Sequence, residues 1–295
     1  MDYKKHVRID LHIHSTASDG TLSPPEIISL AHSLNLGAIA ITDHDTIDGS
    51  KEALALGIPP SLKFLTGVEI SASFDPSFPC TGSFHMLGYS IRLDDPVLNQ
   101  ALDMLQEARR NRNPNIIKRL NNLGINLSLK DIADEFSECQ LGRPHIAQAM
   151  VKRGYVKSIN EAFDKYLGTG KPAYIDKYRL GCKRAIEVIL GAGGIPVLAH
   201  PVLLHIKDKN RFEHLIANLK EIGLKGIEIY HSDQPPDLAA YYFDVATRHG
   251  LLMTGGSDFH GSIKPDIKMG SGKGDLFVPY EFYEKLIKCA KVPLK

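Results

Sequence analysis

Short apolar or alternating runs, each suited in length to one β-strand, recur along the chain and constrain its fold more than any other feature. Helix-like stretches separate most of them, and a hairpin-like link joins the third run to the fourth. The seven runs cover residues 7–12, 38–42, 63–70, 85–91, 195–199, 226–230 and 251–255. Strands that alternate with helices build parallel sheets, so the pattern predicts an α/β protein of the barrel type.

A long gap between the fourth and fifth runs breaks this rhythm. It holds helix-like segments and no strong strand, so we interpret residues 97–179 as a helical insertion in a barrel of residues 1–96 and 180–295. The predicted helices are 97–112, 116–123, 144–153 and 159–167. The insertion carries 14 Lys and Arg against 9 Asp and Glu, and the remainder carries 21 against 25. A mildly basic cap suits an anionic substrate, although a solvated charged surface explains the same counts.

The composition is that of a soluble globular protein. Hydrophobic residues make up 43% of the 295 and the net charge is +1, which excludes a disordered chain and a strongly basic nucleic-acid coat. No apolar run approaches the ~20 residues of a membrane span, and none follows the first residues as in a signal peptide. The four cysteines include no C-x-x-C pair, so we expect a cytoplasmic protein without a disulfide framework.

Residues of metal-binding type gather where the predicted strands end, which is the active-site face of an α/β barrel. The set comprises His12, His14 and Asp19 after the first run, His44 after the second, Glu69 in the third, His85 opening the fourth, His200 after the fifth, Glu228 and His231 near the sixth, and Asp258 and His260 after the last. Residues two apart on a strand share a face, so His12 and His14 should point together, as should Asp258 and His260.

Several imidazoles and carboxylates that meet in one barrel mouth would be costly to bury without a compensating cation. A single H-x-H or D-x-H arises by chance, but one such element at each of several successive strand ends favours a metal site. Nitrogen and oxygen donors without cysteine predict Mn²⁺, which we prefer, or Fe²⁺ or Zn²⁺. The nine candidate ligands, which are the residues of this set other than Glu228 and His231, are too many for one ion and suit two or three.

The same residues resemble the motifs of the polymerase and histidinol phosphatase (PHP) family of metal-dependent phosphoesterases. The matching stretches are DLHIHS at 10–15, SDG at 18–20, ITDHD at 41–45, GVE at 67–69, AHP at 199–201 and GGSDFH at 255–260. The resemblance implies a distorted (β/α)7, TIM-like barrel. It also implies one metal held by His12, His14, Glu69 and Asp258, a second held by Asp19, His44 and His260, and a third where Glu69 bridges toward His85 and His200.

Two motifs in the insertion narrow this resemblance. GRPHIA at 142–147 and GKPAY at 170–174 are similar to the subgroup that contains the 3′,5′-nucleoside bisphosphate phosphatases and a 5′→3′ ribonuclease. In that subgroup the inserted domain helps to form the substrate pocket, which implies substrate contacts for Arg143, His145 and Lys171. A guanidinium offers two parallel donors to phosphate, although Arg143 and Pro144 could also simply start a helix.

We therefore predict an enzyme that hydrolyses a nucleotide phosphomonoester, with the 3′-phosphate of a 3′,5′-nucleoside bisphosphate as the favoured substrate. A metal-bound hydroxide would attack phosphorus in line, Arg143 would hold a phosphate oxygen, and His145 or His231 would protonate the leaving group. The expected partner is this small nucleotide or a short RNA. We expect no stable nucleic-acid complex and no membrane contact, and the sequence gives no signal for an oligomeric state.

Other functions remain open at this point. A 5′→3′ exoribonuclease would use the same metal centre, but the sequence has no RRM-like or OB-like aromatic platform for RNA. The insertion motifs disfavour a histidinol-phosphate phosphatase. An amidohydrolase also opens with H-x-H on a barrel strand, but it would not combine Asp19, His44 and Glu69 in this order. The complete ligand set disfavours a non-catalytic metal-binding module.

Overall fold

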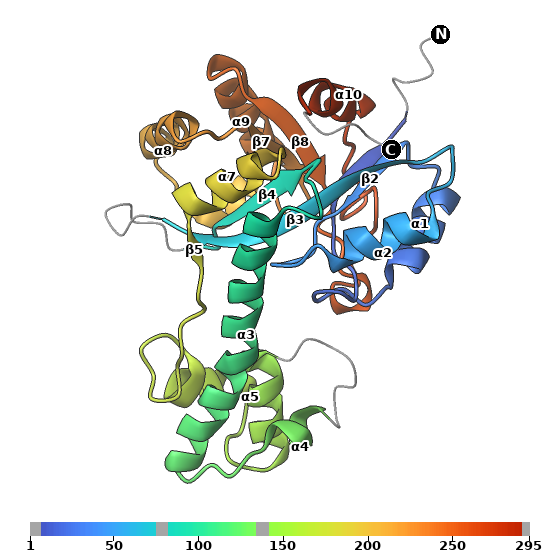
Figure 1. Ribbon diagram of the computed structural model, residues 1–295. Helices are drawn as coiled ribbons and strands as arrows, with labels where there is room; N and C mark the ends of the chain where they lie inside the picture. Colours follow the sequence, from blue (N-terminus) through green and yellow to red (C-terminus); the bar gives the residue numbers. More distant parts are fainter. Residues whose placement is uncertain (1–6, 75–81, 134–141, 291–295) are drawn as a thin grey trace. The chain divides into compact units, whose positions relative to one another are not determined.

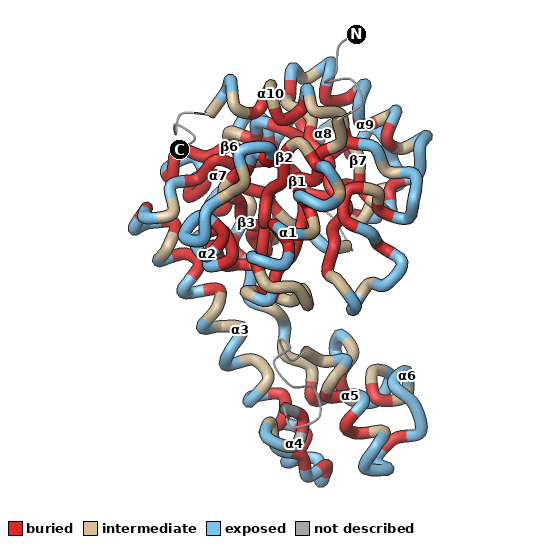
Figure 2. The backbone as a smooth tube through the Cα atoms, turned by 90° about the vertical axis from the view of Figure 1, so that its right-hand side faces the viewer, coloured by how far each residue is buried: buried red, intermediate tan, exposed pale blue. Residues whose placement is uncertain are grey.

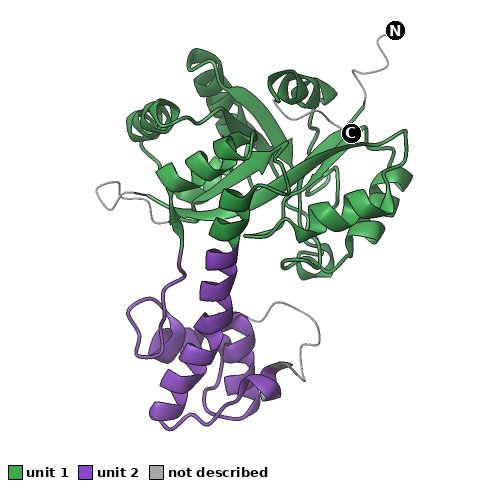
Figure 3. Ribbon diagram, viewed as in Figure 1, with its two compact units in different colours: residues 1–102, 179–295 green, residues 103–178 purple. Residues whose placement is uncertain are grey.

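A computed structural model describes residues 7–74, 82–133 and 142–290 of the chain. The protein divides into two compact units, residues 1–102 with 179–295 and residues 103–178, which Figure 3 distinguishes by colour. The second unit falls within the segment 97–179 that the sequence marks as an insertion. Helix α3 (Pro96–Asn122) contributes residues to both units, so one of the two boundaries lies inside a helix rather than in a linker.

Seven strands of the first unit form a nearly closed barrel (Figure 1). In their order around the barrel they are β1 (Ile9–Ile13), β2 (Ala38–Ile41), β3 (Lys63–Ser73), β4 (His85–Tyr89), β6 (Ile195–Leu198), β7 (Gly226–His231) and β8 (Leu252–Gly256). Each coincides with a predicted run, which confirms the α/β barrel. The two-residue strand β5 (Leu180–Gly181) pairs with the end of β3 and is too short to carry a sequence signal.

Strand β4 runs against its two neighbours. It pairs in antiparallel fashion with β3 and with β6, whereas the other neighbouring strands of the barrel are parallel. The pairing of β3 with β4 agrees with the hairpin-like link expected between the third and fourth runs. Because β4 is reversed, its first residue, His85, lies at the end of the barrel where the parallel strands finish.

The barrel closes between β1 and the segment that follows β8. The Asp258 N–H donates to the His12 carbonyl at 2.9 Å, and the His14 N–H donates to the Phe259 carbonyl at 2.9 Å. Gly256 makes this approach possible, because a Cβ atom there would lie 2.3 Å from the His12 nitrogen and 2.4 Å from its Cβ. Any larger residue at this position would push the two strands apart.

Helices cover the outside of the barrel. They are α1 (Pro24–Ser33), α2 (Asp48–Leu56), α7 (Cys182–Gly191), α8 (Lys209–Glu221), α9 (Pro236–Arg248) and α10 (Tyr280–Cys289). Helix α1 begins as its sequence predicts, with Pro24 at the first position and a Glu26 carboxylate that accepts the Ser23 N–H at 2.8 Å. Buried apolar side chains of α1 and α2 pack against β1, β2 and β3.

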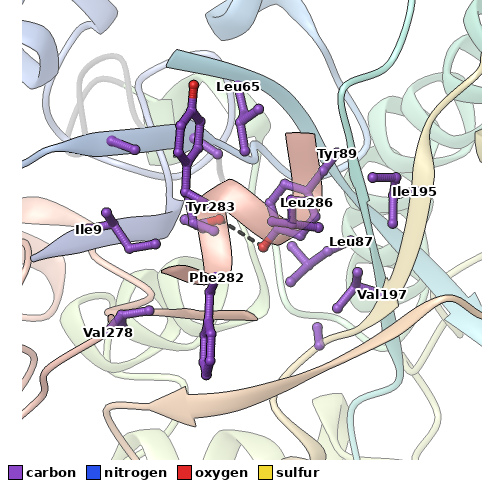
Figure 4. Packing of buried hydrophobic residues seen from close by; sticks show 14 residues of the cluster. Ile9, Leu65, Leu87, Tyr89, Ile195, Val197, Val278, Phe282, Tyr283 and Leu286 are labelled. Carbon is purple, nitrogen blue, oxygen red and sulfur yellow. Dashed lines mark hydrogen bonds between the residues drawn. The ribbon is translucent and has the colours of Figure 1, made fainter. Parts of the chain in front are cut away.

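One large apolar cluster joins five strands of the barrel to α10. Side chains of β1, β2, β3, β4 and β6 pack there against Phe282, Tyr283 and Leu286 of α10 (Figure 4). The Tyr89 hydroxyl is buried among them and donates to the Leu11 carbonyl at 2.9 Å. Figure 2 shows the central strands as almost continuously buried, so polar residues on them need partners inside the protein.

The unit of residues 103–178 has a core of its own. After α3 it contains α4 (Leu129–Ala133), α5 (Arg143–Lys152), α6 (Ile159–Ala162) and a π-helical turn, Phe163–Leu167. One expectation is wrong here, because Pro114 lies inside α3 where the sequence predicts a break between two helices. Buried Ile116, Ile117 and Leu120 anchor the helix after the proline, and this packing offsets the lost backbone hydrogen bond.

The structure describes two of the four cysteines. Cys182 and Cys289 form no disulfide among the described residues, and Cys80 and Cys139 lie outside them. Within the described ranges, every helix is too short or too polar to cross a membrane.

We predict that Gly256→Ala lowers the free energy of unfolding by about 1–3 kcal/mol, because the added methyl group forces the closing strands apart. Gly191→Ala is the matched control, since a Cβ atom there meets nothing within 4 Å and the residue lies in α7. The control should leave stability unchanged or raise it by up to ~1 kcal/mol. Urea unfolding of both variants measures the difference, and equal stabilities would contradict the assigned contact.

Candidate metal centre

The candidate ligands meet at the end of the barrel where the parallel strands finish. Strands β1, β3 and β4 carry three of them directly, and the loops after β1, β2, β6 and β8 carry the others. They are His12, His14, Asp19, His44, Glu69, His85, His200, Asp258 and His260. The fold therefore brings together the nine residues that the sequence singles out as metal ligands.

Glu69 is the centre of this cluster. Its side chain is 1% exposed, and both carboxylate oxygens face imidazole nitrogens. Oε1 lies 2.8 Å from His85 Nδ1 and 2.8 Å from His200 Nε2. Oε2 lies 2.8 Å from His44 Nδ1 and 3.3 Å from His14 Nε2. A carboxylate with ring nitrogens on both oxygens is well placed to bridge two cations.

A second group surrounds Asp19, the most exposed of the candidate ligands. Its Oδ1 lies 3.5 Å from His260 Nε2 and 3.6 Å from His14 Nδ1, and its Oδ2 lies 3.8 Å from His44 Nε2. Ligand atoms of these four residues all fall within 4.8 Å of one another. The Asp19 side chain is 31% exposed, so the cluster is accessible on this side.

Two more groups satisfy the same distance criterion. They are His12 with His14 and Glu69, and His44 with Glu69 and His85. His14 thus belongs to two groups, although the family resemblance assigns it to one metal only. Its two nitrogens explain this, because Nδ1 faces Asp19 Oδ1 at 3.6 Å while Nε2 faces Glu69 Oε2 at 3.3 Å.

Several buried polar atoms of the cluster make no hydrogen bond among the described residues. They are His12 Nε2, both ring nitrogens of His14, His44 Nδ1, Glu69 Oε2 and His200 Nδ1. Leaving a buried donor or acceptor unpaired costs about 1–3 kcal/mol. Six unpaired atoms in one cluster therefore need an explanation. Divalent cations supply it, because they accept lone pairs from nitrogen and oxygen donors of this kind. The donor set therefore fits metal ions.

The electrostatics of the cluster also favour cations. Burial raises the pKa of Glu69, but the surrounding histidines outweigh it and hold that pKa well below its usual range. Burial lowers the pKa of His14, yet Asp258 and Glu69 raise it to about 10. At His85 burial dominates and lowers the pKa to about 3, which keeps this ring neutral and its nitrogen available. The ionised carboxylates that draw a proton onto His14 would attract a divalent ion in the same way, and a bound ion would displace that proton.

Glu228 orients one of the candidate ligands, a role that the sequence leaves open. Its Oε1 accepts from His12 Nδ1 at 2.9 Å, and its Oε2 accepts the His200 N–H at 2.6 Å. The Glu228 side chain is fully buried. Holding Nδ1 in this way directs His12 Nε2 toward Glu69 and fixes the tautomer that a metal ligand needs. Residues so far apart in sequence give no local signal of this contact.

Asp258 divides its two oxygens between different neighbours. Oδ1 faces His14 in the cluster, whereas Oδ2 lies 2.6 Å from Lys264 Nζ and 3.5 Å from His231 Nε2. His231 also accepts the Asp233 N–H at Nδ1, and its ring is 1% exposed. The sequence marks His231 as a candidate acid, and the structure places it against Asp258. The sequence gives no indication that Lys264, whose side chain is 40% exposed, contacts Asp258.

The remaining candidates lie in the unit of residues 103–178. Arg143 opens α5, donates to the Leu167 carbonyl at 3.0 Å and stacks 5.1 Å from the centre of the Tyr174 ring. His145 accepts the Gly142 N–H at Nδ1, and partial burial lowers its pKa. Lys171 is exposed. Arg143 and His145 therefore both have structural contacts within their own unit.

Comparison with known proteins identifies a protein family. The sequence model of the PHP domain family matches residues 10–244 of this chain. The 3′,5′-nucleoside bisphosphate phosphatase of Chromobacterium violaceum is 34% identical, covering 85% of this chain and 87% of the relative. A 5′-3′ exoribonuclease of Haemophilus influenzae is 33% identical, covering 86% and 90%. A solved structure from Bifidobacterium adolescentis, named as a metal-dependent phosphoesterase, superposes with a TM-score of 0.75 at 28% identity and covers 97% of each chain.

We predict that Glu228→Gln weakens divalent-metal binding about 10- to 100-fold, because an amide cannot accept from His12 and from the His200 N–H at once. Glu213→Gln is the control, since Glu213 pairs with Arg248 on the surface of α8 and should leave the affinity unchanged. Calorimetric titration of metal-free protein with Mn²⁺ measures both. An unaltered affinity for Glu228→Gln would contradict the orienting role.

Proposed function

The chain belongs to the PHP domain family of metal-dependent phosphoesterases, and from this premise we propose that it releases the 3′-phosphate of a 3′,5′-nucleoside bisphosphate. The observation that carries the proposal is the Glu69 cluster, where several buried ring nitrogens and the Glu69 oxygen Oε2 have no hydrogen-bond partner among the described residues. The substrate is chosen because the bisphosphate phosphatase of Chromobacterium violaceum is 34% identical over 260 residues.

The proposed ligand set holds two or three divalent ions. The distances support one site at His12, His14 and Glu69 with Asp258, and another at Asp19, His44 and His260 with His14. Glu69 with His85, and with His44 or His200, would complete a third. Mixed nitrogen and oxygen donors suit Mn²⁺ best in our proposal, with Fe²⁺ or Zn²⁺ as alternatives. Ions bound there would supply an activated water and neutralise the charge of the phosphate oxygens.

The protein's own side chains prepare this site. Glu228 fixes the ring of His12, so that Nε2 rather than Nδ1 is offered to the cluster. Lys264 and His231 hold Asp258 Oδ2, which leaves Oδ1 for the cluster. Fixed ligands need no rearrangement when charge develops on the phosphate, and such preorganisation is a large part of catalysis. The proton donor to the leaving group stays a prediction, with His145 and His231 as the candidates.

A second candidate function is 5′→3′ exonucleolytic cleavage of short RNA. It is favoured by the exoribonuclease of Haemophilus influenzae, which is 33% identical to this chain over 253 residues. The same metal centre would serve a phosphodiester, so the ligand geometry does not separate the two reactions. The two reactions differ in how many nucleotides the protein has to bind beyond the reacting phosphate. Substrate assays measure this difference directly.

We predict rapid release of inorganic phosphate from 3′,5′-adenosine bisphosphate in the presence of Mn²⁺, with a short 5′-phosphorylated RNA left intact. Phosphate release and the appearance of mononucleotides are measured side by side. His12→Ala should abolish both turnover and metal content, while His32→Ala, an exposed residue of α1, should preserve them. Stepwise release of mononucleotides from the RNA would contradict this proposal and support the exoribonuclease activity.

We also predict that Arg143→Ala raises the KM for the bisphosphate about 10- to 100-fold, because a charge-assisted hydrogen bond to phosphate is lost. Metal content should not change. Since Arg143 also bonds Leu167, the exposed Lys171→Ala provides a second test, with a smaller rise in KM. Lys165→Ala, an exposed lysine paired with Glu161, is the control. An unchanged KM in both test variants would contradict the prediction that the unit of residues 103–178 binds substrate.

A further inference from the structure

Three aspartates near the metal centre each bind one serine in the same way. Asp10 accepts the Ser257 N–H on Oδ1 at 2.9 Å and the Ser257 hydroxyl on Oδ2 at 2.5 Å. Each carboxylate oxygen thus takes one donor of the same residue. We call such an aspartate–serine pair a clamp, because the two bonds fix both the backbone and the side chain of the serine.

The other two clamps repeat this geometry. Asp43 accepts the Ser15 N–H at 2.7 Å and the Ser15 hydroxyl at 2.6 Å. Asp45 accepts the Ser71 N–H at 2.7 Å and the Ser71 hydroxyl at 2.7 Å. All six clamp residues are at most 1% exposed. Buried charge-assisted bonds of this length are strong and directional, so each clamp holds its two chain segments in one arrangement.

The clamps join four successive strands at the barrel mouth. One links β1 to the segment after β8, one links the segments after β1 and β2, and one links the segment after β2 to β3. Each serine lies beside a candidate ligand in sequence. Ser257 precedes Asp258, Ser15 follows His14, and Ser71 is two residues after Glu69. Asp43 and Asp45 flank His44 on both sides.

We propose that the three clamps are positioning elements that set the spacing of the metal ligands on neighbouring strands. This inference rests on the metal centre proposed above. It extends that proposal to residues that touch neither metal nor substrate, and that the sequence motifs alone would leave as unexplained polar neighbours of the ligands.

Regular strand pairing cannot provide this spacing by itself. Strand β2 ends at Ile41, before His44, and the contact of His44 with Glu69 is an isolated bridge beyond the ladder. The pairing of β1 with β2 also shifts register between Asp10 and Ile13. His12, His44 and Asp258 therefore lie on irregular backbone, whereas Glu69 and His85 belong to the regular pairing of β3 with β4. Asp45 and Asp258 adopt left-handed φ values of 57° and 56°, which are unfavourable unless surrounding contacts impose them.

Neighbouring atoms pack tightly around the clamp formed by Asp43 and Ser15. A Cβ atom on Gly49, at the start of α2, would lie 2.1 Å from Asp43 Oδ2 and 2.7 Å from Ser15 Oγ. Ser18 adds a second hydroxyl, and so a third donor, to the same carboxylate, at 2.6 Å from Asp43 Oδ1, and it directly precedes the ligand Asp19. Asp43 thus organises the turn that carries Asp19 as well as the segment after β1 that carries His14.

The alternative is that the clamps only stabilise the fold. Ser50 separates the two interpretations, because its buried hydroxyl also connects β2 with β3 but bonds backbone within these strands and no aspartate beside a ligand. Its Oγ is 3.2 Å from the Ile41 carbonyl and accepts the Gly67 N–H at 3.1 Å. Ser50 is 1% exposed and Ser71 is 0% exposed, so the two serines form a matched pair.

The test compares Ser71→Ala with Ser50→Ala in the full-length protein. Both variants lose a buried hydroxyl, so we expect their Tm values to fall by a similar few degrees. Calorimetric titration with Mn²⁺ should then separate them. Ser71→Ala should bind the ion about 10-fold more weakly than the wild type, as removal of a ligand's supporting contact does, and Ser50→Ala should bind it normally.

The outcomes distinguish failure of the clamps from failure of the centre. Equal Mn²⁺ affinities of Ser71→Ala, Ser50→Ala and the wild type would overturn the positioning role and leave the metal centre intact. A wild type that binds no divalent ion would overturn the centre and the clamps together. Should Ser71→Ala not fold, Ser15→Ala serves in its place, since it removes the equivalent bond to Asp43. For that variant the same 10-fold loss supports the inference and an unaltered affinity overturns it.

Discussion

The structure of the first unit depends on one buried carboxylate. Glu69 is 1% exposed, and ring nitrogens of His12, His14, His44, His85 and His200 lie within 3.5 Å of its oxygens. Burying a charge is costly unless counter-charges and hydrogen bonds surround it, and here the counter-groups come from strands far apart in sequence. A closed barrel meets this requirement, because it brings the ends of β1, β2, β4 and β6 around β3. Away from this carboxylate, Tyr89 and the other strand side chains of the apolar cluster pack against α10.

Two features of the barrel follow from this demand. The first is the reversal of β4, which places His85 at the mouth although it opens its strand. The second is the tight seam at Gly256, where β8 approaches the backbone of His12. This approach lets Asp258 reach the cluster from the opposite edge of the sheet, with Oδ1 at 3.5 Å from His12 Nε2. Strand direction and seam geometry thus serve the arrangement of charge, and neither would be required by hydrophobic burial alone.

The sequence predicts those parts of this structure that depend on local patterns. Each strand is a short apolar run, and each ligand sits at or just after the end of one, so both the barrel and the gathering of His12, Glu69 and Asp258 can be read from the chain. Contacts between residues far apart in sequence cannot be predicted in this way, because they depend on how the strands align. Glu228 binds a histidine 216 residues away, and the clamp between Asp10 and Ser257 spans 247 residues. Pro114 shows the converse failure, since a strong local signal for a break is overridden by the packing of Ile116 and Leu120.

The metal centre alone does not determine the substrate. A phosphate held among the proposed ligands offers the same charges to them whether the rest of the molecule is a nucleoside or an RNA chain, so discrimination has to come from groups outside the cluster. A bisphosphate makes one specific demand, because only one of its phosphates can be at the reacting position and the other needs a cation elsewhere. Lys264 is a cation beside the cluster with an exposed side chain, and Arg143 and Lys171 are the cations that the insertion motifs contribute. An oligonucleotide would in addition need a flat apolar surface for its second base. The choice between the two proposed reactions is therefore made by cations and aromatic surfaces around the centre, and the clamped ligands serve either reaction equally.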